Sequence, residues 1–248
     1  RYVIGNNIDA SDTVNWNSAA GFNPLGNNTT QFSGILDGLG NKISNLTINR
    51  PTTDYVGLFG RTNGASIRNI GLLGGSVTGR DAVGGLVGLN NNSNISNAYA
   101  TGSVTGANSS VGGLVGYNNS SSISNAYATG SVTGQYAVGG LVGENGNSSS
   151  ISNAYATGAV TGGQNYVGGL VGYNNSNISN AYATGAVTGQ FFVGGLVGVN
   201  TNNSSISNAY ATGAVTGNQF VGGLVGSGGN ISNAYWNMET TGQTTSAG

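Results

Sequence analysis

The side chains able to carry out acid–base chemistry are few and lie mostly in the first third of this 248-residue chain. Polysaccharide lyases and hydrolases need clustered carboxylates, or a carboxylate beside a basic residue. The N-terminal residues that could form such a cluster are Asp37, Asp54, Asp81, Arg61 and Arg80. The regular part of the chain adds only Glu144. These scattered charges are a thin basis for catalysis, so we expect no enzyme and no catalytic residues, with a polysaccharide-degrading enzyme as a minor alternative.

Composition excludes several other chemistries. The chain has no histidine and no cysteine, which removes imidazole catalysis, thiol chemistry, disulfides and the usual zinc and copper ligands. We therefore expect no metal and no cofactor. Charged residues make up only 5% of the chain, against about 25% in an average globular domain. Such a surface cannot neutralise phosphates, so nucleic acid and anionic lipid are not expected partners. No apolar run is long enough to insert into a membrane.

Two short blocks repeat along the chain. The block ISNAYATGSVTG begins at Ile95 and recurs with few changes at Ile123, Ile151, Ile178 and Ile206. The block VGGLVG begins at Val83, Val111, Val138, Val167, Val193 and Val221. A period in this range, with strand-forming residues and Asn/Ser-rich turns, predicts a stacked solenoid. The expected fold is all-β: a right-handed parallel β-helix with about three short strands in each rung.

Degenerate copies of the repeat extend the array toward the N-terminus. KISNLTINR aligns with the regular block through Ile43, and ASIRNIGLLGGSVTG aligns through Ile67. With a last start at Ile231, this predicts about eight rungs of roughly 24–29 residues. The expected organisation is an N-terminal opening segment and cap over residues 1–42, degenerate rungs over 43–82, regular rungs over 83–237 and a tail over 238–248. A last rung without a cap would offer an open strand edge.

The degenerate rungs indicate which side chains face the core. Strand side chains alternate, so either the alanines or the tyrosine of ISNAYA could point inward. At the two alanine positions the early rungs carry bulky apolar residues, Leu46 with Ile48 and then Ile70 with Leu72. We therefore expect the alanines inside and the tyrosines outside. By the same alternation, Val104 is expected inside, and Thr101 and Thr105 outside.

One asparagine is present in every predicted rung. We expect it to face inward at a bend and to bond the rungs above and below through its amide; a row of ligands is the alternative. The members of this predicted asparagine ladder are Asn45, Asn69, Asn97, Asn125, Asn153, Asn180, Asn208 and Asn233. The glycines of VGGLVG lack the strand–loop–helix context and the lysine of a phosphate-binding loop. They are expected to allow a bend or a close approach of neighbouring backbones.

Outward aromatic residues are the predicted contact surface. Stacking between rungs would by itself explain them, but exposed aromatic rows also bind sugars or partner proteins, and both interpretations stay open. The first group is the tyrosine file of the repeat: Tyr99, Tyr127, Tyr155, Tyr182 and Tyr210, continued by Tyr235. The second group lies before the valine of the later rungs: Tyr136, Tyr166, Phe191, Phe192 and Phe220.

The threonine rows raise the alternative of an ice-binding solenoid. Such solenoids present pairs of outward threonines separated by one residue. Thr101 and Thr105 are four residues apart with Gly102 between them, so they need not share a face. An ice-binding surface is therefore a minor alternative.

The blocks VGGLVG and ISNAYATG resemble the GLUG-motif repeats of bacterial secreted proteins, which are similar to large surface adhesins of the filamentous-haemagglutinin type. The resemblance covers Val83 to Tyr235 most strongly, and FSGILDGLGNKISNLTI resembles the segment that precedes such arrays. It implies a β-helical rod within a larger exported protein, and it implies no catalytic residues. The absence of a signal-like segment at Arg1 is what a processed chain or a fragment would show.

Together these observations predict a non-enzymatic structural and adhesive module, a rigid spacer or filament segment of a bacterial surface protein that acts in cell adhesion or biofilm. The expected location is secreted or at the cell surface. The expected partners are other copies of the chain or a host or biofilm surface, either protein or glycan. A carbohydrate-binding module that uses the outward aromatic rows is the main alternative.

Overall fold

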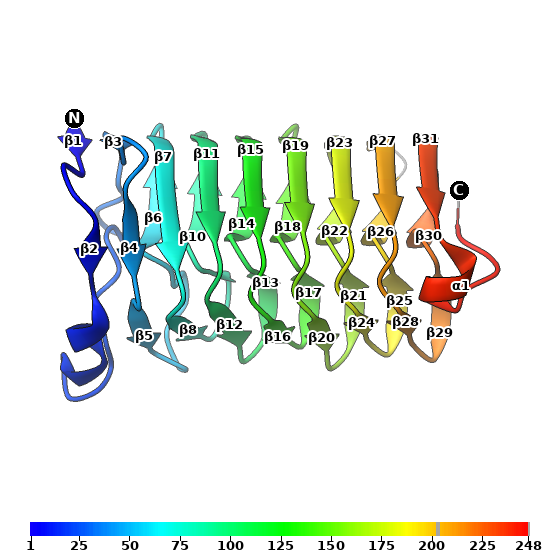
Figure 1. The fold of residues 1–248 in the computed structure, drawn as a ribbon, viewed down its shortest axis with the longest axis horizontal. Helices are drawn as coiled ribbons and strands as arrows, with labels where there is room; N and C mark the ends of the chain where they lie inside the picture. Colours follow the sequence, from blue (N-terminus) through cyan, green and yellow to red (C-terminus); the bar gives the residue numbers. More distant parts are fainter. Residues whose placement is uncertain (202–203, 248) are drawn as a thin grey trace.

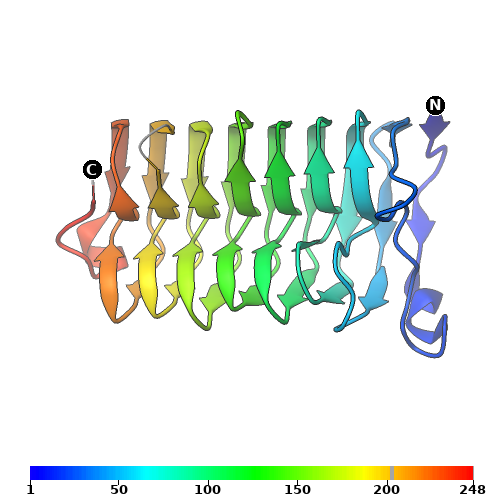
Figure 2. The same ribbon diagram turned by 180° about the vertical axis from the view of Figure 1, so that it is seen from behind.

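The chain folds into a parallel β-helix of about seven turns, with the two termini at opposite ends of a rod (Figure 1). The computed structural model describes residues 1–201 and 204–247. The opposite view shows the same stacking along the whole rod (Figure 2). The predicted all-β solenoid is confirmed, and its rung count is close to the eight that were predicted. Within the described part of the chain, no helix is both long and apolar enough to cross a membrane.

Each turn contributes strands to four parallel sheets, here called A, B, C and D, rather than to the three that were predicted. The extra strand arises because the VGGLVG block bends at its second glycine and leucine, which splits it between sheets D and C. Sheet A contains β1 (Tyr2–Val3), β3 (Ile35–Asp37), β7 (Ser66–Leu73), β11 (Asn94–Ala100), β15 (Ser122–Ala128), β19 (Ser150–Ala156), β23 (Asn177–Ala183), β27 (Ser205–Ala211) and β31 (Ile231–Trp236), with β2 (Ile8–Asp9) and β4 (Lys42–Ser44) beside this path.

The other three sheets complete the cross-section. Sheet B contains β5 (Thr47–Asn49), β8 (Ser76–Gly79), β12 (Ser103–Gly106), β16 (Val132–Gly134), β20 (Val160–Gly162), β24 (Val187–Thr188) and β28 (Val215–Thr216). Sheet C contains β6 (Phe59–Asn63), β10 (Val87–Asn91), β14 (Val115–Asn119), β18 (Val142–Gly146), β22 (Val171–Asn174), β26 (Val197–Asn200) and β30 (Val225–Gly228). Sheet D contains β9 (Val83–Gly84), β13 (Ser109–Gly112), β17 (Tyr136–Gly139), β21 (Asn165–Gly168), β25 (Phe191–Gly194) and β29 (Gln219–Gly222).

Residues skipped by the strand pairing turn the chain at fixed points of every rung. In sheet A the pairing passes from Ser96 to Ala98 and omits Asn97, whose φ is 50°. In sheet D it omits Ser110, whose φ is 55°, and in sheet C it omits Gly116. Both paired strands skip the equivalent residue, as at Asn97 and Asn125, so the two strands bend together and the alternation of their side chains is reset. We call each such residue a bulge, by analogy with the extra residue of a β-bulge. Because each rung has the same bulges, the bends stack into straight edges.

The core is a continuous apolar column enclosed by the sheets. In a typical rung Ile123, Val132, Leu141 and Val142 are at most 1% exposed. Burial of each such side chain contributes about 1.5–3 kcal/mol. The repeat alanines also face this column, as predicted, with Ala126 at 2% exposure.

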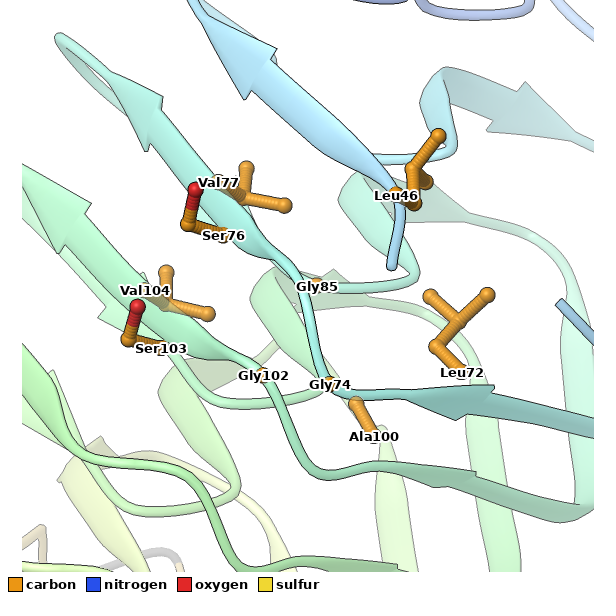
Figure 3. Close-up of a pocket in the computed structure, with 10 residues that line it drawn as sticks. All are labelled: Leu46, Leu72, Gly74, Ser76, Val77, Gly85, Ala100, Gly102, Ser103 and Val104. Carbon is orange, nitrogen blue, oxygen red and sulfur yellow. The ribbon is translucent and has the colours of Figure 1, made fainter. Parts of the chain in front are cut away.

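Small inward residues allow the walls to approach closely at one side of the core. Figure 3 shows Leu46, Leu72, Ala100 and Val104 around a narrow gap of about 10 Å³ beside Gly85. A Cβ atom on Gly85 would lie 3.1 Å from the Ala100 Cβ and 2.7 Å from the Gly113 carbonyl oxygen. The second glycine of VGGLVG therefore permits close backbone approach, as the sequence predicted. The gap has room for at most about one water molecule, so it is packed core rather than a ligand site.

A second row of asparagines, which the sequence analysis treated as turn residues, is buried inside sheet C. Each side chain donates its amide to the carbonyl oxygen of the next at 2.7–2.9 Å, in the order Asn90, Asn118, Asn145, Asn174 and Asn200. Thr62 donates to the first member, and all six side chains are at most 1% exposed. Serines alongside complete the polar row, since the hydroxyls of Ser121 and Ser149 accept hydrogen bonds from the backbone of the preceding rung. We call Thr62 and the five asparagines the buried amide ladder.

The ends of the rod have different covers. At the N-terminal end β1 stacks on β3, and Leu25 and Phe32 bridge to β6, with the 3₁₀ helix η1 (Ser11–Asn15) alongside. At the C-terminal end helix α1 (Met238–Thr241) and the residues after it fold back on the last rung. Thr245 accepts a hydrogen bond from the Gly223 amide, and Ala247 donates to Val225. The tail therefore covers part of the strand edge at the end of the last rung, which was predicted to be open.

The first predicted rung is wrong in its register. Leu36 pairs with Ile67, whereas Ile43 pairs with Leu72 and Ile48 with Val77. The strand that stacks on β7 is interrupted by a turn at residues 38–41, which gives β3 and β4 in place of one regular strand. Leu46 and Ile48 are buried, but they do not occupy alanine positions of the repeat. Ile70 and Leu72 do, and they suffice for the inward assignment.

The buried amide ladder leads to a stability prediction. Asn145→Ala removes the acceptor of the Asn118 amide and the donor to Asn174 inside the protein. Each buried polar group left without a partner costs about 1–3 kcal/mol, so the free energy of unfolding should fall by about 2–5 kcal/mol in urea titrations. Asn94→Ala removes an exposed amide from sheet A and should change stability by less than about 0.5 kcal/mol. Equal effects of the two variants would contradict a stabilising role for the ladder.

Candidate contact surface

The outer face of sheet A carries the tyrosine file. Its rings stack nearly parallel, with centroids 4.8–4.9 Å apart and interplanar angles of 3–4°, through Tyr99, Tyr127, Tyr155, Tyr182 and Tyr210. Burial first, and the neighbouring phenol next, raises the pKa of Tyr127 and of Tyr182. Tyr235, in the last rung, is 68% exposed. The file is thus an ordered aromatic surface that runs along the rod.

The asparagine of the repeat lies beside this file and is exposed in the regular rungs, as at Asn97, Asn125 and Asn153, so the predicted inward orientation is wrong. From Asn69 to Asn233 the seven asparagines have φ between 48° and 54°. Asparagine tolerates this left-handed conformation better than other non-glycine residues, which explains its recurrence. Hydrogen bonds between successive amides, such as Asn97 to Asn69 at 3.0 Å and Asn180 to Asn153 at 3.2 Å, link the row.

Asn45 does not belong to this row, which corrects the predicted first member. Its neighbour Ser44 pairs with Leu73, its backbone amide bonds to the Leu73 carbonyl and its side chain bonds to Asp9, so Asn45 lies at the corner after β7 and not against Asn69. The Asn69 amide instead donates to the carboxylate of Asp37 at 3.0 Å. The misplacement follows from the interrupted first strand, which moves KISN out of register with the repeat.

The second aromatic group divides into two rows. Tyr166 and Phe192 have ring centroids 5.5 Å apart, and Phe192 and Phe220 stack at 4.6 Å with an interplanar angle of 5°. Tyr173 of sheet C contacts Tyr166 at 5.5 Å and extends this group. We call these four residues the aromatic cluster.

Tyr136 and Phe191 lie in the other row. They occupy the position two residues before the valine, where Tyr136 pairs with Ser109 and Phe191 pairs with Asn165 and Gln219. Neither ring stacks on another aromatic ring within the described residues. The sequence analysis grouped them with Phe192 because the bulge at the following residue, which separates the two rows, is not visible in the sequence.

Glu144 lies between two tyrosines on the outer side of sheet C. It pairs in register with Tyr117 on one side and Tyr173 on the other, and it accepts a hydrogen bond from the Ser110 hydroxyl at 3.2 Å. Burial raises the pKa of Glu144 above its usual value, and the Ser110 hydrogen bond opposes this. The sequence analysis missed Tyr117 and Tyr173. Their signal is that each directly follows the last glycine of VGGLVG, but that glycine is a bulge and hides the direction of the next side chain.

The N-terminal carboxylates form structural ion pairs. Asp37 is 4% exposed and bonds Arg68 at 2.9 Å. The Asn69 amide, the Leu39 backbone amide and Arg68 lower the pKa of Asp37 to about 2. Arg80 lies between the other two carboxylates, 2.6 Å from that of Asp54 and 3.5 Å from that of Asp81. A general acid needs a raised pKa so that it holds a proton near neutral pH. The lowered pKa of Asp37 keeps its carboxylate ionised, so Asp37 is not suited to donate a proton.

The threonine rows do not form the paired array of an ice-binding face at these positions. Thr101 lies at the corner between β11 and β12, half-buried, and its hydroxyl accepts a hydrogen bond from the Gly74 amide at 2.8 Å. Thr105 lies within β12 and is exposed. The two side chains therefore belong to different parts of the cross-section.

The fold and its surfaces define a parallel β-helical repeat protein with ordered aromatic rows. The chain belongs to the GLUG-motif family, because five segments that together make up more than half of it match the GLUG motif: residues 79–105, 107–133, 134–161, 163–188 and 192–216. These segments cover the regular rungs as far as residue 216.

Two known proteins are similar to this chain. Halomucin from Haloquadratum walsbyi is 45% identical over 89 residues, which cover 34% of this chain and only 1% of halomucin. The crystal structure of a Bacteroides ovatus protein, a proposed immunoglobulin A1 protease, matches with a TM-score of 0.71 over 95% of this chain and 77% of that chain. Sequence identity to the second protein is 24%, so the likeness concerns the fold.

The position of Glu144 predicts a pH dependence of stability. Because its pKa is raised by folding, the folded chain binds this proton more readily than the unfolded chain. The contribution of Glu144 to stability should therefore be largest below its ordinary pKa of 4.5 and be lost as the pH rises through the raised value. Glu144→Gln should be more stable than the wild type at about pH 7, with the difference shrinking toward about pH 4, in urea titrations.

A matched control is Glu239→Gln, which removes the same charge from the exposed tail. A difference between Glu144→Gln and the wild type that grows as the pH falls would contradict the assignment.

Proposed function

We propose that this chain is a rigid structural module of a larger extracellular polypeptide, and that the aromatic cluster is its contact surface for adhesion or self-association. The proposed location is the cell surface or the secreted fraction. The partner is a second copy of the chain or a protein or glycan on an opposing surface.

One observation carries this proposal: the fold does not need aromatic residues where the cluster lies. The position before the valine is Tyr55 in the first rung, Ala82, Ser110 and Ala137 in the next three, and Tyr166, Phe192 and Phe220 in the later ones. All of these have φ between 49° and 66°, a conformation that is unfavourable for bulky side chains. Phe220 is also 57% exposed. Tyr166 and Phe192 are half-buried. Aromatic rings that reach the surface from a strained position where alanine suffices favour a role in binding.

The rest of the rod supports a structural role. Its stability comes from contacts between successive rungs, as in other solenoids, so rungs can be added to extend its length. The segment similar to this chain makes up 1% of halomucin, so related repeats occur inside a very long protein. A chain in which only 5% of the residues are charged has little electrostatic repulsion to keep two rods apart.

The test is the double variant Phe192→Ser with Phe220→Ser. Analytical ultracentrifugation and binding to an immobilised layer of the same chain should show contact weakened by about tenfold or more, because aromatic residues dominate interface energies. Circular dichroism should show an unchanged β-helix, since neither ring is part of the core.

The control is Tyr210→Ser, which removes a 44% exposed ring from sheet A instead of the cluster. It should leave this contact unchanged. Self-association and surface binding that persist in the correctly folded double variant would refute the proposal.

A second function, binding of carbohydrate by outward aromatic residues, is favoured by the tyrosine file. Its stacked rings lie next to a row of exposed amides, and together they form a regular uncharged face of aromatic and hydrogen-bonding groups. Sugar recognition uses this combination, because the C–H face of a sugar ring packs on an aromatic ring while its hydroxyls bond to polar groups. Within the file the stacked rings cover one another's faces, so such packing is available at the end of the file. An array of glycans that gives no binding would contradict this function.

A further inference from the structure

The tyrosine file ends at a hollow near the N-terminal end of sheet A. Tyr99 is the first ring of the file, and the residue paired with it in the preceding strand is Gly71. The hollow there has a volume of about 500 Å³, and its lining includes Leu39, Gly40, Asn69, Gly71, Asn97 and Tyr99. This is within the range of roughly 300–1,000 Å³ that is usual for small-ligand sites.

Tyr99 supplies an aromatic platform that the other rings of the file do not. The interior tyrosines, such as Tyr155, have a stacked ring on both sides, 4.8 Å away. Tyr99 stacks only on Tyr127, so within the described residues its other side has no aromatic neighbour and borders the hollow. The Tyr99 ring lies over Gly71, where an added Cβ atom would collide with it, so glycine at this position gives the ring its place at the edge of the hollow.

The opposite wall of the hollow is a preformed turn. Leu39 is 57% exposed and has a φ of 53°, which is unfavourable for leucine. Two hydrogen bonds fix the turn. The Asp37 carboxylate accepts a hydrogen bond from the Leu39 backbone amide at 3.1 Å, and the backbone carbonyl of Asn69 accepts one from the Gly40 backbone amide at 2.9 Å. An apolar side chain held out to solvent in a strained conformation is a feature that the core does not require.

The rim of the hollow is polar but uncharged. Asn97 donates its amide to the Asn69 carbonyl oxygen at 3.0 Å, which orients both side chains. Each carbonyl oxygen has two lone pairs, so both amides can still bond a ligand hydroxyl. The carboxylate that holds Asn69, Asp37, is already paired with Arg68. The hollow thus combines an aromatic face, an apolar wall and fixed amides without a free charge.

From this geometry we infer that the hollow binds one ring of a neutral pyranose sugar, at the end of a glycan chain or within it. The weakly positive C–H face of the sugar packs on the negative π face of Tyr99, and Leu39 contacts the other face. Asn69 and Asn97 bond to the ring hydroxyls. The inference rests on the second proposed function, carbohydrate binding by outward aromatic residues, and it locates that binding at one position.

The experiment titrates the full 248-residue chain with cellotetraose, xylotetraose and triacetylchitotriose, and follows binding by saturation-transfer NMR and calorimetry. At least one of these neutral sugars should bind. Tyr99→Ser should weaken binding by about fivefold or more, since the loss of one stacking contact is worth about 1 kcal/mol. Tyr99→Phe keeps the ring and should bind as the wild type does. Leu39→Ser, a surface change, should also weaken binding.

Tyr155→Ser is the matched control, because it removes a ring of the same file that does not border the hollow. It should bind the sugars as the wild type does, and circular dichroism should show that each variant is folded. Wild-type affinity in folded Tyr99→Ser would overturn the inference. If the double variant of Phe192 and Phe220 lost sugar binding instead, this inference would fail while the carbohydrate function stood. No binding of any sugar by the wild type, or binding of aromatic peptides alone, would overturn both.

Discussion

In-register stacking of one backbone conformation is the constraint on which the whole molecule depends. Each strand of a rung pairs with the equivalent strand of the next, so any residue type at a given position becomes a row along the rod. At a rung spacing of about 4.8 Å, a row of identical side chains is always in contact with itself. Only residues that pack well on their own copies can recur: branched aliphatics in the core, amides that bond in chains, and flat rings that stack.

The same constraint explains why two asparagine rows serve different purposes. In sheet C the buried amides of Asn118 and Asn145 bond to each other, so each polar group in the interior finds its partner in the next rung. In sheet A the asparagine recurs because its backbone is left-handed, and its amide is exposed. One residue type therefore meets a side-chain requirement in the first row and a backbone requirement in the second.

Candidate contact residues stand out where a row departs from what stacking requires. At the position before the valine, alanine and serine satisfy the fold, and the change to Tyr166, Phe192 and Phe220 adds half-buried and exposed rings at a strained position. At Gly71 the tyrosine row stops, which leaves the hollow beside Tyr99. In a repeat protein such irregularities carry more information about binding than the repeated residues, because the repeated residues are explained by the fold.

The sequence alone determined the β-helix, its period, the inward alanines and valines and the outward tyrosine file, because side chains alternate along a strand and the bulky Ile70 and Leu72 of a degenerate rung indicate which set faces the core. The sequence did not determine the fourth strand, the buried amide ladder, the exposure of Asn97 or the separation of Tyr136 and Phe191 from the aromatic cluster. The fourth strand depends on the bend at the second glycine and the leucine of VGGLVG, and the other features depend on a bulge, at Asn97, at Ser110 and its equivalents, or at Gly116, which resets the alternation. A bulge is a choice of backbone torsion angles stabilised by the neighbouring rungs, so only the tertiary structure decides where it falls.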